Sequence, residues 1–159
     1  MTQQHCVTTE TGCVVCDALA AIPYTPPSAT TLPGIGWNAG ADSADTIDGD
    51  LHLVFTMGQV VGAICGFKSA RTIVGSPVAI NYGFGFFAAE SLLIFYIVEN
   101  GYTVFDGAPY SPGDTFEIRR QGQFVTYWQN DTRIYTSTRP SYGPLFVSAC
   151  EYVAGDTIG

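Results

Sequence analysis

Residues 115–137 decide the fold, and they read TFEIRRQGQFVTYWQNDTRIYTS. Three short runs of this stretch, 115–120, 124–128 and 133–137, are rich in the β-branched and aromatic residues that are typical of β-strands. Polar turn sequences separate the runs, Gln121-Gly122 after the first and Gln129-Asn130-Asp131 after the second. The pattern therefore predicts an antiparallel meander of three strands joined by tight turns.

Strand-like patterns continue on the N-terminal and C-terminal sides of this meander. Residues 51–56 alternate, and the continuous apolar run 92–98 predicts a central strand buried on both faces, followed by the hairpin signal Asn100-Gly101. The other expected strands are 60–67, 78–88, 102–105 and 145–152, and glycines in the first two suggest bends or bulges. No window from 35 to 159 has helical periodicity. We expect an all-β protein, an antiparallel β-sandwich of the jelly-roll type.

Residues 1–34 have a different composition from the rest of the chain. They are rich in Thr, Pro and Cys, and prolines recur between residues 23 and 33. Proline fixes φ and pushes the preceding residue into extended geometry. We predict an extended N-terminal arm over 1–34, in which at most 14–22 forms a short helix, and a sandwich domain over 35–159.

The charge balance excludes several classes of protein. Six Lys and Arg face 14 Asp and Glu among 159 residues, which gives a formal net charge of −8 and makes a basic surface for nucleic acid unlikely on composition grounds. A membrane span needs about 20 uninterrupted apolar residues, and the sequence has no such run. Ten Phe and nine Tyr argue against a disordered chain. With 47% hydrophobic and 13% charged residues, we expect partners to cover part of the surface.

Residues 110–158 carry a series of short patterns in a fixed order. They are Gly113-Asp114-x-Phe116-x-Ile118, Val125-x-Tyr127-x-x-Asn130, Ile134-Tyr135-x-Ser137, Pro144-Leu145 and Ala149-x-x-Tyr152. This order resembles concanavalin A-like jelly rolls, the class of legume lectins, laminin-G-type modules and SPRY-type modules. The resemblance implies the sandwich fold and leaves function open, because this fold serves binding, structural and hydrolytic proteins alike.

The whole chain also resembles a component of a tailed-bacteriophage particle, through its Cys- and Pro-bearing arm, single sandwich and acidic, aromatic-rich composition. This resemblance implies a non-enzymatic structural protein of the virion: a capsid decoration or head-fibre protein, or a tail adaptor or fibre-base protein. No signal peptide is evident at the N-terminus, so synthesis in the host cytoplasm is expected. The arm would dock on other virion proteins and the chain would form a homo-oligomer, with neither nucleic acid nor membrane as a partner.

Three of the five cysteines lie close together, at Cys6, Cys13 and Cys16. The Cys-x-x-Cys pair has the right spacing for a tetrahedral metal, and His5 or Cys6 would add ligands to a metal ion or iron–sulfur cluster. A disulfide, within the arm or to another subunit, is the second interpretation, and reduced thiols are the third. No other cofactor is expected.

No convincing catalytic set is present. Four acidic residues crowd one segment, at Asp42, Asp45, Asp48 and Asp50. Paired carboxylates serve glycosidases and oxygen clusters bind calcium, but the spacing fits neither well, and a solvated acidic turn is the simpler interpretation. His52 lies between two leucines and is expected on the more polar face of its strand. We therefore expect no enzymatic activity.

A carbohydrate-binding module that attaches to a host or surface glycan is the alternative function. Sugars stack their C–H faces on aromatic rings, while arginine and amide side chains bind their hydroxyl groups. The meander offers such a patch in Trp128, Tyr135, Arg119 and Asn130. The competing interpretation is that one aromatic row fills the core and the other packs against a neighbouring subunit.

Overall fold

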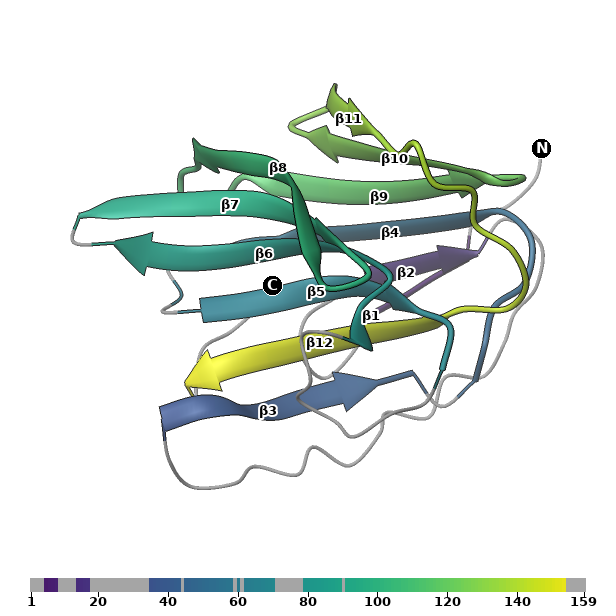
Figure 1. Cartoon of the computed structure of the whole chain (residues 1–159), viewed down its shortest axis with the longest axis horizontal. Coiled ribbons are helices and arrows are strands. Elements are labelled where there is room, and N and C mark those ends of the chain that lie inside the picture. Colours follow the sequence, from purple (N-terminus) through teal and green to yellow (C-terminus); the bar gives the residue numbers. More distant parts are fainter. Residues whose placement is uncertain are drawn as a thin grey trace.

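The computed structural model describes residues 5–8, 14–17, 35–43, 45–58, 60, 62–70, 79–89 and 91–153. Over these residues the chain forms twelve β-strands in two six-stranded antiparallel sheets, packed as a sandwich (Figure 1). The expected all-β sandwich is confirmed. No helix in the described residues has the length and apolar character needed to cross a membrane.

Sheet A contains the N-terminal hairpin and the meander at its opposite edges. Its order is β1 (His5–Thr8), β2 (Val14–Asp17), β4 (Leu51–Thr56), β9 (Thr115–Gln121), β10 (Phe124–Gln129) and β11 (Thr132–Thr136). Sheet B has the order β3 (Ile35–Asp42), β12 (Phe146–Val153), β5 (Gly62–Lys68), β6 (Tyr82–Ala89), β7 (Leu92–Glu99) and β8 (Tyr102–Pro109). The predicted meander is β9–β11. The predicted hairpin joins β7 to β8 through Asn100 and Gly101, whose φ angles are 51° and 81°.

Two strands come from the segment predicted to be an extended arm. β1 pairs with β2, and β2 pairs with β4, so the described part of residues 1–34 forms one edge of sheet A. The short helix considered for 14–22 is wrong at Val14–Asp17, because β4 supplies a partner strand for this segment and its β-branched Val14 and Val15. The boundary at residue 34 stays a prediction, since the other residues of the segment lie outside the described ones.

An aromatic cluster fills the space between the sheets. Phe116 lies at its centre, and its ring centroid is 4.8 Å from that of Phe86 and 5.1 Å from those of Phe84 and Phe95. All four rings are buried, and each stabilises the fold by about 1.5–3 kcal/mol. Val125 and Tyr127 of β10 are buried toward this core, while Trp128 on the other face of the strand is half-buried.

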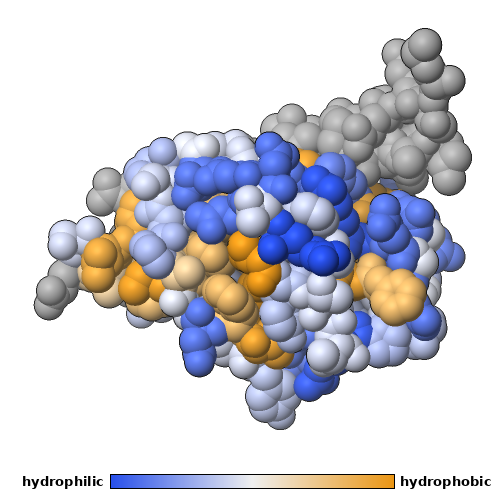
Figure 2. Space-filling view, turned by 90° about the horizontal axis from the view of Figure 1, so that it is seen from above, coloured by the Kyte–Doolittle hydropathy of each residue, from blue (hydrophilic) through white to orange (hydrophobic). Residues whose placement is uncertain are grey.

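The core is less closed at the edge where β8 and β11 end the two sheets. Val104, Phe105 and Ile134 are only half-buried there, although they pack against the main cluster. Figure 2 looks onto this side of the molecule and shows a band of hydrophobic side chains between hydrophilic flanks. The sandwich therefore exposes apolar surface at this edge.

The expectation that residues 92–98 are buried on both faces is wrong for one face. Phe95 and Ile97 point inward and are buried, whereas Ile94 and Tyr96 on the other face are half-buried. Leu92, at the start of the strand, is 58% exposed. The apolar outer residues of β7 therefore belong to a surface of sheet B that is only partly covered.

Candidate functional site

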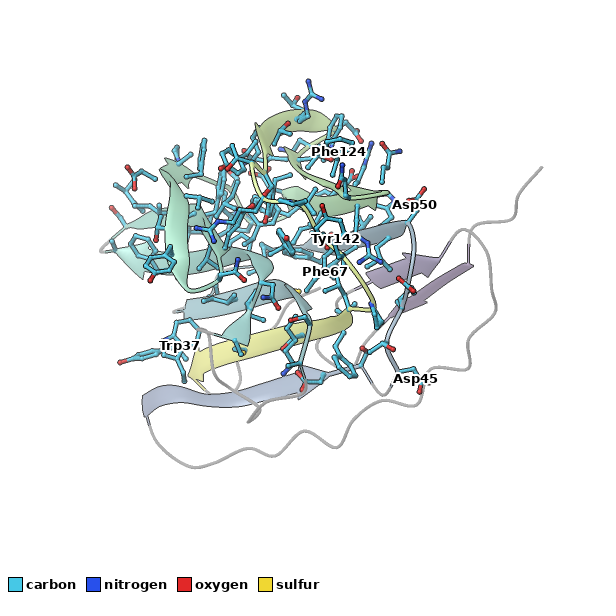
Figure 3. All side chains as sticks on the ribbon, turned by 45° about the vertical axis from the view of Figure 1, so that its right-hand side comes forward. Trp37, Asp45, Asp50, Phe67, Phe124 and Tyr142 are labelled. Carbon is cyan, nitrogen blue, oxygen red and sulfur yellow. The ribbon has the colours of Figure 1, made fainter. Side chains whose placement is uncertain are left out.

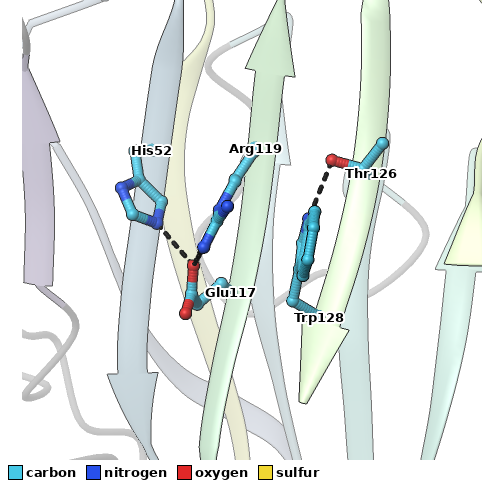
Figure 4. Close-up of polar contacts among 5 residues, drawn as sticks. All are labelled: His52, Glu117, Arg119, Thr126 and Trp128. Carbon is cyan, nitrogen blue, oxygen red and sulfur yellow. Dashed lines mark hydrogen bonds and ion pairs between the residues drawn. The ribbon is translucent and has the colours of Figure 1, made fainter. Parts of the chain in front are cut away.

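The outer face of sheet A carries a cluster of charged side chains. Glu117 on β9 accepts hydrogen bonds at Oε2 from His52 Nε2 of β4, at 2.7 Å, and from Arg119 Nε, at 2.8 Å (Figure 4). The carboxylate is 6% exposed, while the side chains of His52 and Arg119 are 26% and 32% exposed. His52 thus lies on the more polar face of its strand, as the sequence predicted.

The two bases determine the ionisation of Glu117. Burial by itself raises the pKa of this carboxyl group, but hydrogen bonds and charge from His52 and Arg119 outweigh burial, so the pKa of Glu117 lies below its ordinary value. Glu117 is therefore an anion at neutral pH, bound by the His52 imidazole and the Arg119 guanidinium. Such a group suits a structural ion pair better than proton donation.

Trp128 on β10 is engaged by neighbours within the same sheet. The guanidinium carbon of Arg119, on β9, lies 4.2 Å from its ring centroid, and that of Arg133, on β11, lies 6.0 Å away. The indole N–H donates to Thr126 Oγ1 at 2.9 Å (Figure 4). Arginines from the strands on both sides of β10 therefore lie against the half-buried ring that the sequence offered for stacking on a sugar.

The four residues predicted to bind glycan do not gather at one place. Arg119 and Trp128 are neighbours on the outer face, whereas the ring of Tyr135 packs against Tyr127 at 5.8 Å, on the inner side. Asn130 sits in the β10–β11 turn, where its amide accepts from Thr115 N and donates to a carboxylate. Sugar binding by these residues stays a prediction, and the geometry favours another surface.

The acidic segment 42–50 does not form one cluster either. Asp42 is buried at the end of β3, where it pairs with Lys68 Nζ at 2.6 Å and accepts from Ser148 Oγ at 2.8 Å. Asp45 is exposed, and Figure 3 shows it well apart from Asp50. The carboxylates therefore do not share the single site that calcium would require.

The turn before β4 binds a buried arginine. Arg120 points into the sandwich and donates from Nε to Gly49 O at 2.6 Å and from Nη1 to Gly143 O at 2.7 Å. Asp50 Oδ1 accepts from Gly122 N at 2.7 Å, and the 76%-exposed Asp48 is 3.9 Å from Arg120. The solvated acidic turn expected from the sequence thus joins β4 to the β9–β10 turn.

A groove crosses the outer face of sheet B, and residues from all six of its strands line it. Its volume is about 560 Å³, and its aromatic lining includes Trp37 of β3, Phe87 of β6, Tyr96 of β7 and Tyr152 of β12. None of the described residues that line it is charged. Figure 3 shows Trp37 far from Phe124, so this groove and the meander are separate surfaces.

Glycines form the floor of this groove. Gly85 is the register partner of Tyr96, and a Cβ at position 85 would lie 2.1 Å from Cζ of that ring. A Cβ at Gly62 would lie 2.9 Å from Cβ of Tyr152. The rings of Tyr96 and Tyr152 therefore lie close over positions that must lack a side chain.

The aromatic side chains of the groove contact one another in pairs. The rings of Trp37 and Tyr152 are 5.6 Å apart at 71°, and those of Phe87 and Tyr96 are 6.0 Å apart at 55°. Burial raises the pKa of the Tyr96 hydroxyl, which therefore stays protonated at neutral pH. The lining thus combines flat apolar rings with neutral hydroxyl groups.

Sequence reasoning missed this site because it interpreted the glycines as bends or bulges. The β5–β6 register instead runs from Gly62 to Phe67 without a shift. A usable signal was present in β6, where Gly83 and Gly85 alternate with the core residue Phe84. Such a strand buries one face and leaves the other bare.

The N-terminal cysteines were the other predicted site. The structure places Cys6 in β1 and Cys16 in β2, and Cys13 lies outside the described residues. Metal, disulfide and thiol states of these residues all stay predictions. Among the described side chains, no group of three or more His, Cys, Asp or Glu is placed to hold a metal ion.

Comparisons with known proteins bear on the fold. No protein-family model matches the chain, and no curated protein matches it. Among solved structures, the PSpry domain of TRIM65 superposes with a TM-score of 0.54 and 14% identity, over 99% of this chain and 85% of that chain. The chain therefore has the concanavalin A-like sandwich fold that its sequence resembles.

Two other superpositions have lower scores. A β-glucanase from Bacillus licheniformis matches with a TM-score of 0.43 and 12% identity, over 94% of this chain and 71% of that chain. The carbohydrate-binding module CBM66 from Bacillus subtilis matches with a TM-score of 0.42 and 12% identity, over 99% and 87%. At these values neither says what this chain binds, and the expected phage role is not addressed by any of the three.

Proposed function

We propose that this chain is a carbohydrate-binding domain that holds a neutral glycan in the groove of sheet B. The observation that carries the proposal is the uncharged aromatic lining of that groove over a glycine floor. Its volume, about 560 Å³, falls within the range of small-ligand sites. The proposal therefore keeps glycan binding, the alternative function predicted from the sequence, but places the site on sheet B instead of on the meander of sheet A.

The chemistry of the lining suits sugars. The rings of Trp37, Tyr96 and Tyr152 offer faces and edges to the C–H surface of a pyranose ring. The hydroxyl groups of the two tyrosines and of Thr103 supply donors and acceptors for its hydroxyls. An acidic polysaccharide is disfavoured, because no cation lines the groove among the described residues and the chain carries a net charge of −8.

The course of the groove favours a polymer over a monosaccharide. Residues from six adjacent strands line it, and adjacent strands lie about 4.8 Å apart, so its length is on the order of 24 Å. Binding without hydrolysis is the proposed activity. Glycosidases act through a pair of carboxylates, and none of the described lining residues is Asp or Glu.

The role in a tailed-phage particle stays a prediction. So do the non-enzymatic structural role, the homo-oligomer, docking through the N-terminal segment and location in the virion. A glycan-binding domain is compatible with such a role as an attachment device, but no observation on the described residues favours it. Glycan binding is the function for which the chain offers a built site.

Affinity for a panel of neutral polysaccharides tests the proposal. We expect the full chain to be retarded in native gels containing one of soluble β-glucan, xylan or mannan, with the affinity then measured by calorimetry. Tyr96→Ala removes the ring over Gly85 and should weaken binding at least about tenfold, or about 1.4 kcal/mol. Trp37→Ala should weaken it similarly, and circular dichroism melts confirm that both variants fold.

Trp128→Ala is the matched control, because it removes an aromatic ring of sheet A and should leave the affinity unchanged. If Trp128→Ala abolishes binding while Tyr96→Ala preserves it, the glycan site lies where the sequence first placed it. If the folded chain binds no member of the panel at millimolar sugar, the proposed function is wrong.

A further inference from the structure

A lysine and an aspartate are buried together at one end of sheet B. Lys68, the last residue of β5, and Asp42, the last residue of β3, are 2% and 6% exposed. Lys68 Nζ lies 2.6 Å from Asp42 Oδ2, and Asp42 is the only acidic partner of this amine among the described residues. A buried ammonium and carboxylate lose most of their hydration, so their attraction must offset a large cost in free energy.

The two oxygens of the Asp42 carboxyl group are held differently. Ser148 of β12 is the register partner of Asp42, and its hydroxyl donates to Oδ1 at 2.8 Å. Oδ2 is buried, but no described group forms a hydrogen bond with it, and its contact with Lys68 Nζ lacks hydrogen-bond geometry. Oδ1 therefore has a fixed donor, and Oδ2 lies against the amine.

The amine is within reach of the carboxyl carbon. Oδ2 is bonded to Cγ, and a carbon–oxygen bond is about 1.2 Å long, so Nζ lies no more than about 3.8 Å from Cγ. Reacting atoms in a near-attack geometry are about 3–3.5 Å apart. Groups held in this way reach effective concentrations of about 10⁵–10⁸ M, and burial excludes the water that drives the reverse reaction. The position of this pair therefore favours condensation.

We propose that Lys68 and Asp42 form an amide bond, a covalent cross-link that the chain makes without a cofactor or a second reactant. Nζ passes one proton to Oδ2 and, as a neutral amine, attacks Cγ. The negative charge that develops on Oδ1 is stabilised by the hydroxyl group of Ser148. Nζ then gives a second proton to Oδ2, which leaves as water, so one ammonium and one carboxylate become one amide and one water molecule.

The cross-link would fasten the edge strand of sheet B. β3 pairs only with β12 among the described strands, and β5 lies on the other side of β12. A bond from Asp42 to Lys68 passes across β12 and ties β3 to β5. It also closes a loop between these two residues, which limits the conformations of the unfolded chain. The proposal does not depend on glycan binding, because neither residue is among those that line the groove.

The mass of the full chain, measured after reduction and denaturation, tests the cross-link. We expect the wild type to be lighter than its sequence by one water molecule. Lys68→Arg is the matched control, because it keeps the positive charge but has no nucleophilic amine, and it should have its full mass. Asp42→Ala should also have its full mass, and circular dichroism melts show whether each variant folds.

Cleavage at Met57 locates the bond. Met57 is the only methionine between Asp42 and Lys68, so cyanogen bromide places these two residues on different fragments. In reducing, denaturing electrophoresis, we expect the wild-type fragments to stay linked and those of Lys68→Arg and Asp42→Ala to separate. Trypsin should fail to cut after Lys68 in the wild type, because an acylated lysine carries no positive charge.

The rate at which the cross-link forms tests the part played by Ser148. Samples taken during cell-free synthesis of the full chain give the linked fraction against time. Ser148→Ala should slow the formation of linked fragments at least about tenfold, because it removes the donor to Oδ1. Ser148→Thr keeps a hydroxyl group and should restore most of the rate.

Three results would overturn the proposal. The first is wild-type protein of full mass whose fragments separate, which would make Lys68 and Asp42 an ordinary buried ion pair. This result is read on the wild type and needs no variant to fold. The second is fragments that stay linked in Lys68→Arg, which would place the bond elsewhere. The third is a cross-link that forms as fast in Ser148→Ala as in the wild type, which would remove the hydroxyl group from the reaction.

Discussion

The two outer faces of this sandwich are built on opposite principles. On sheet A, long polar side chains cover the strands and satisfy one another, as Arg119 does by contacting Glu117 and Trp128 together. On sheet B, glycines leave the strands bare, and aromatic rings lie over them with part of their surface open. The first face is closed by its own contacts, and the second keeps an open apolar groove.

The difference between the two outer faces indicates which of them can gain free energy by binding a ligand. Side chains that already hold partners gain little from a ligand, because each new contact replaces an old one. Part of the apolar surface of the Tyr96 and Tyr152 rings remains exposed to solvent, and a ligand that covers this surface gains hydrophobic free energy. Changes that fill the glycine positions should therefore affect sheet B much more than polar changes affect sheet A.

The largest effect is expected from Gly66→Ala on β5. A Cβ at this position would lie 2.1 Å from Tyr82 O and 2.5 Å from Gly83 Cα, which are backbone atoms of the paired strand β6. Because neither atom can move without separating the strands, the substitution should lower the free energy of unfolding by about 3 kcal/mol or more. Urea denaturation followed by fluorescence measures this loss.

Gly122→Ala is the control on sheet A. Gly122 has a φ of +58° and no heavy atom within 4 Å of the position of an added Cβ. Only backbone strain opposes the alanine, so we expect a loss of about 1 kcal/mol. If Gly66→Ala and Gly122→Ala lower the free energy of unfolding equally, the close contact between β5 and β6 is not what makes Gly66 necessary.

An intermediate effect is expected from two buried glutamates with opposite pKa shifts. Glu117 is stabilised as an anion by His52 and Arg119, so its pKa is lowered. Glu99 lies between the sheets; burial raises its pKa, and hydrogen bonds from Ser137 and Tyr127 only partly offset this. The first ionisation therefore stabilises the fold, and the second destabilises it.

The pH dependence of Tm separates the two groups. The advantage of the wild type over Glu117→Gln should be full at neutral pH and should disappear as the pH falls below about 4, through the lowered pKa. The wild type should instead lose stability relative to Glu99→Gln as the pH rises from the ordinary glutamate pKa through the raised pKa of Glu99. Parallel profiles for the two variants would contradict this assignment.

Much of the sandwich was predictable because its signals are local. The strand-like runs and polar turns of 115–137 and the turn at Asn100-Gly101 predict strands and hairpins from a few residues each, and the structure contains them at β9–β11 and β7–β8. Residues 14–17 were harder to interpret. Their strand state depends on pairing with β4, which is more than 30 residues away, and composition alone favoured an extended arm.

The alternating glycines of β6 indicate a bare strand face, but the groove as a whole was not predictable from local patterns. Its lining includes Trp37 of β3, Tyr96 of β7 and Tyr152 of β12, which lie far apart in the sequence. They meet in one groove because the order of the strands in sheet B differs from their order along the chain. The predicted patch failed to gather for a different reason. A β-bulge between Tyr127 and Trp128 shifts the register with β11, which leaves Tyr135 opposite the inward Tyr127.

The smallest effect is expected from the contact between Arg119 and Trp128, and it tests whether sheet A is closed by its own side chains. Exposed cation–π pairs contribute about 0.5–1 kcal/mol, so a double-mutant cycle of Arg119→Ala and Trp128→Leu should give a coupling free energy of unfolding in that range. Because Arg119 also binds Glu117, the cycle is repeated in Glu117→Gln, where the coupling should persist. Glycan affinity should remain unchanged in every variant, since none of these side chains lines the groove. A coupling near zero, together with altered glycan affinity, would instead make Trp128 an open platform and would erase the distinction between the two faces.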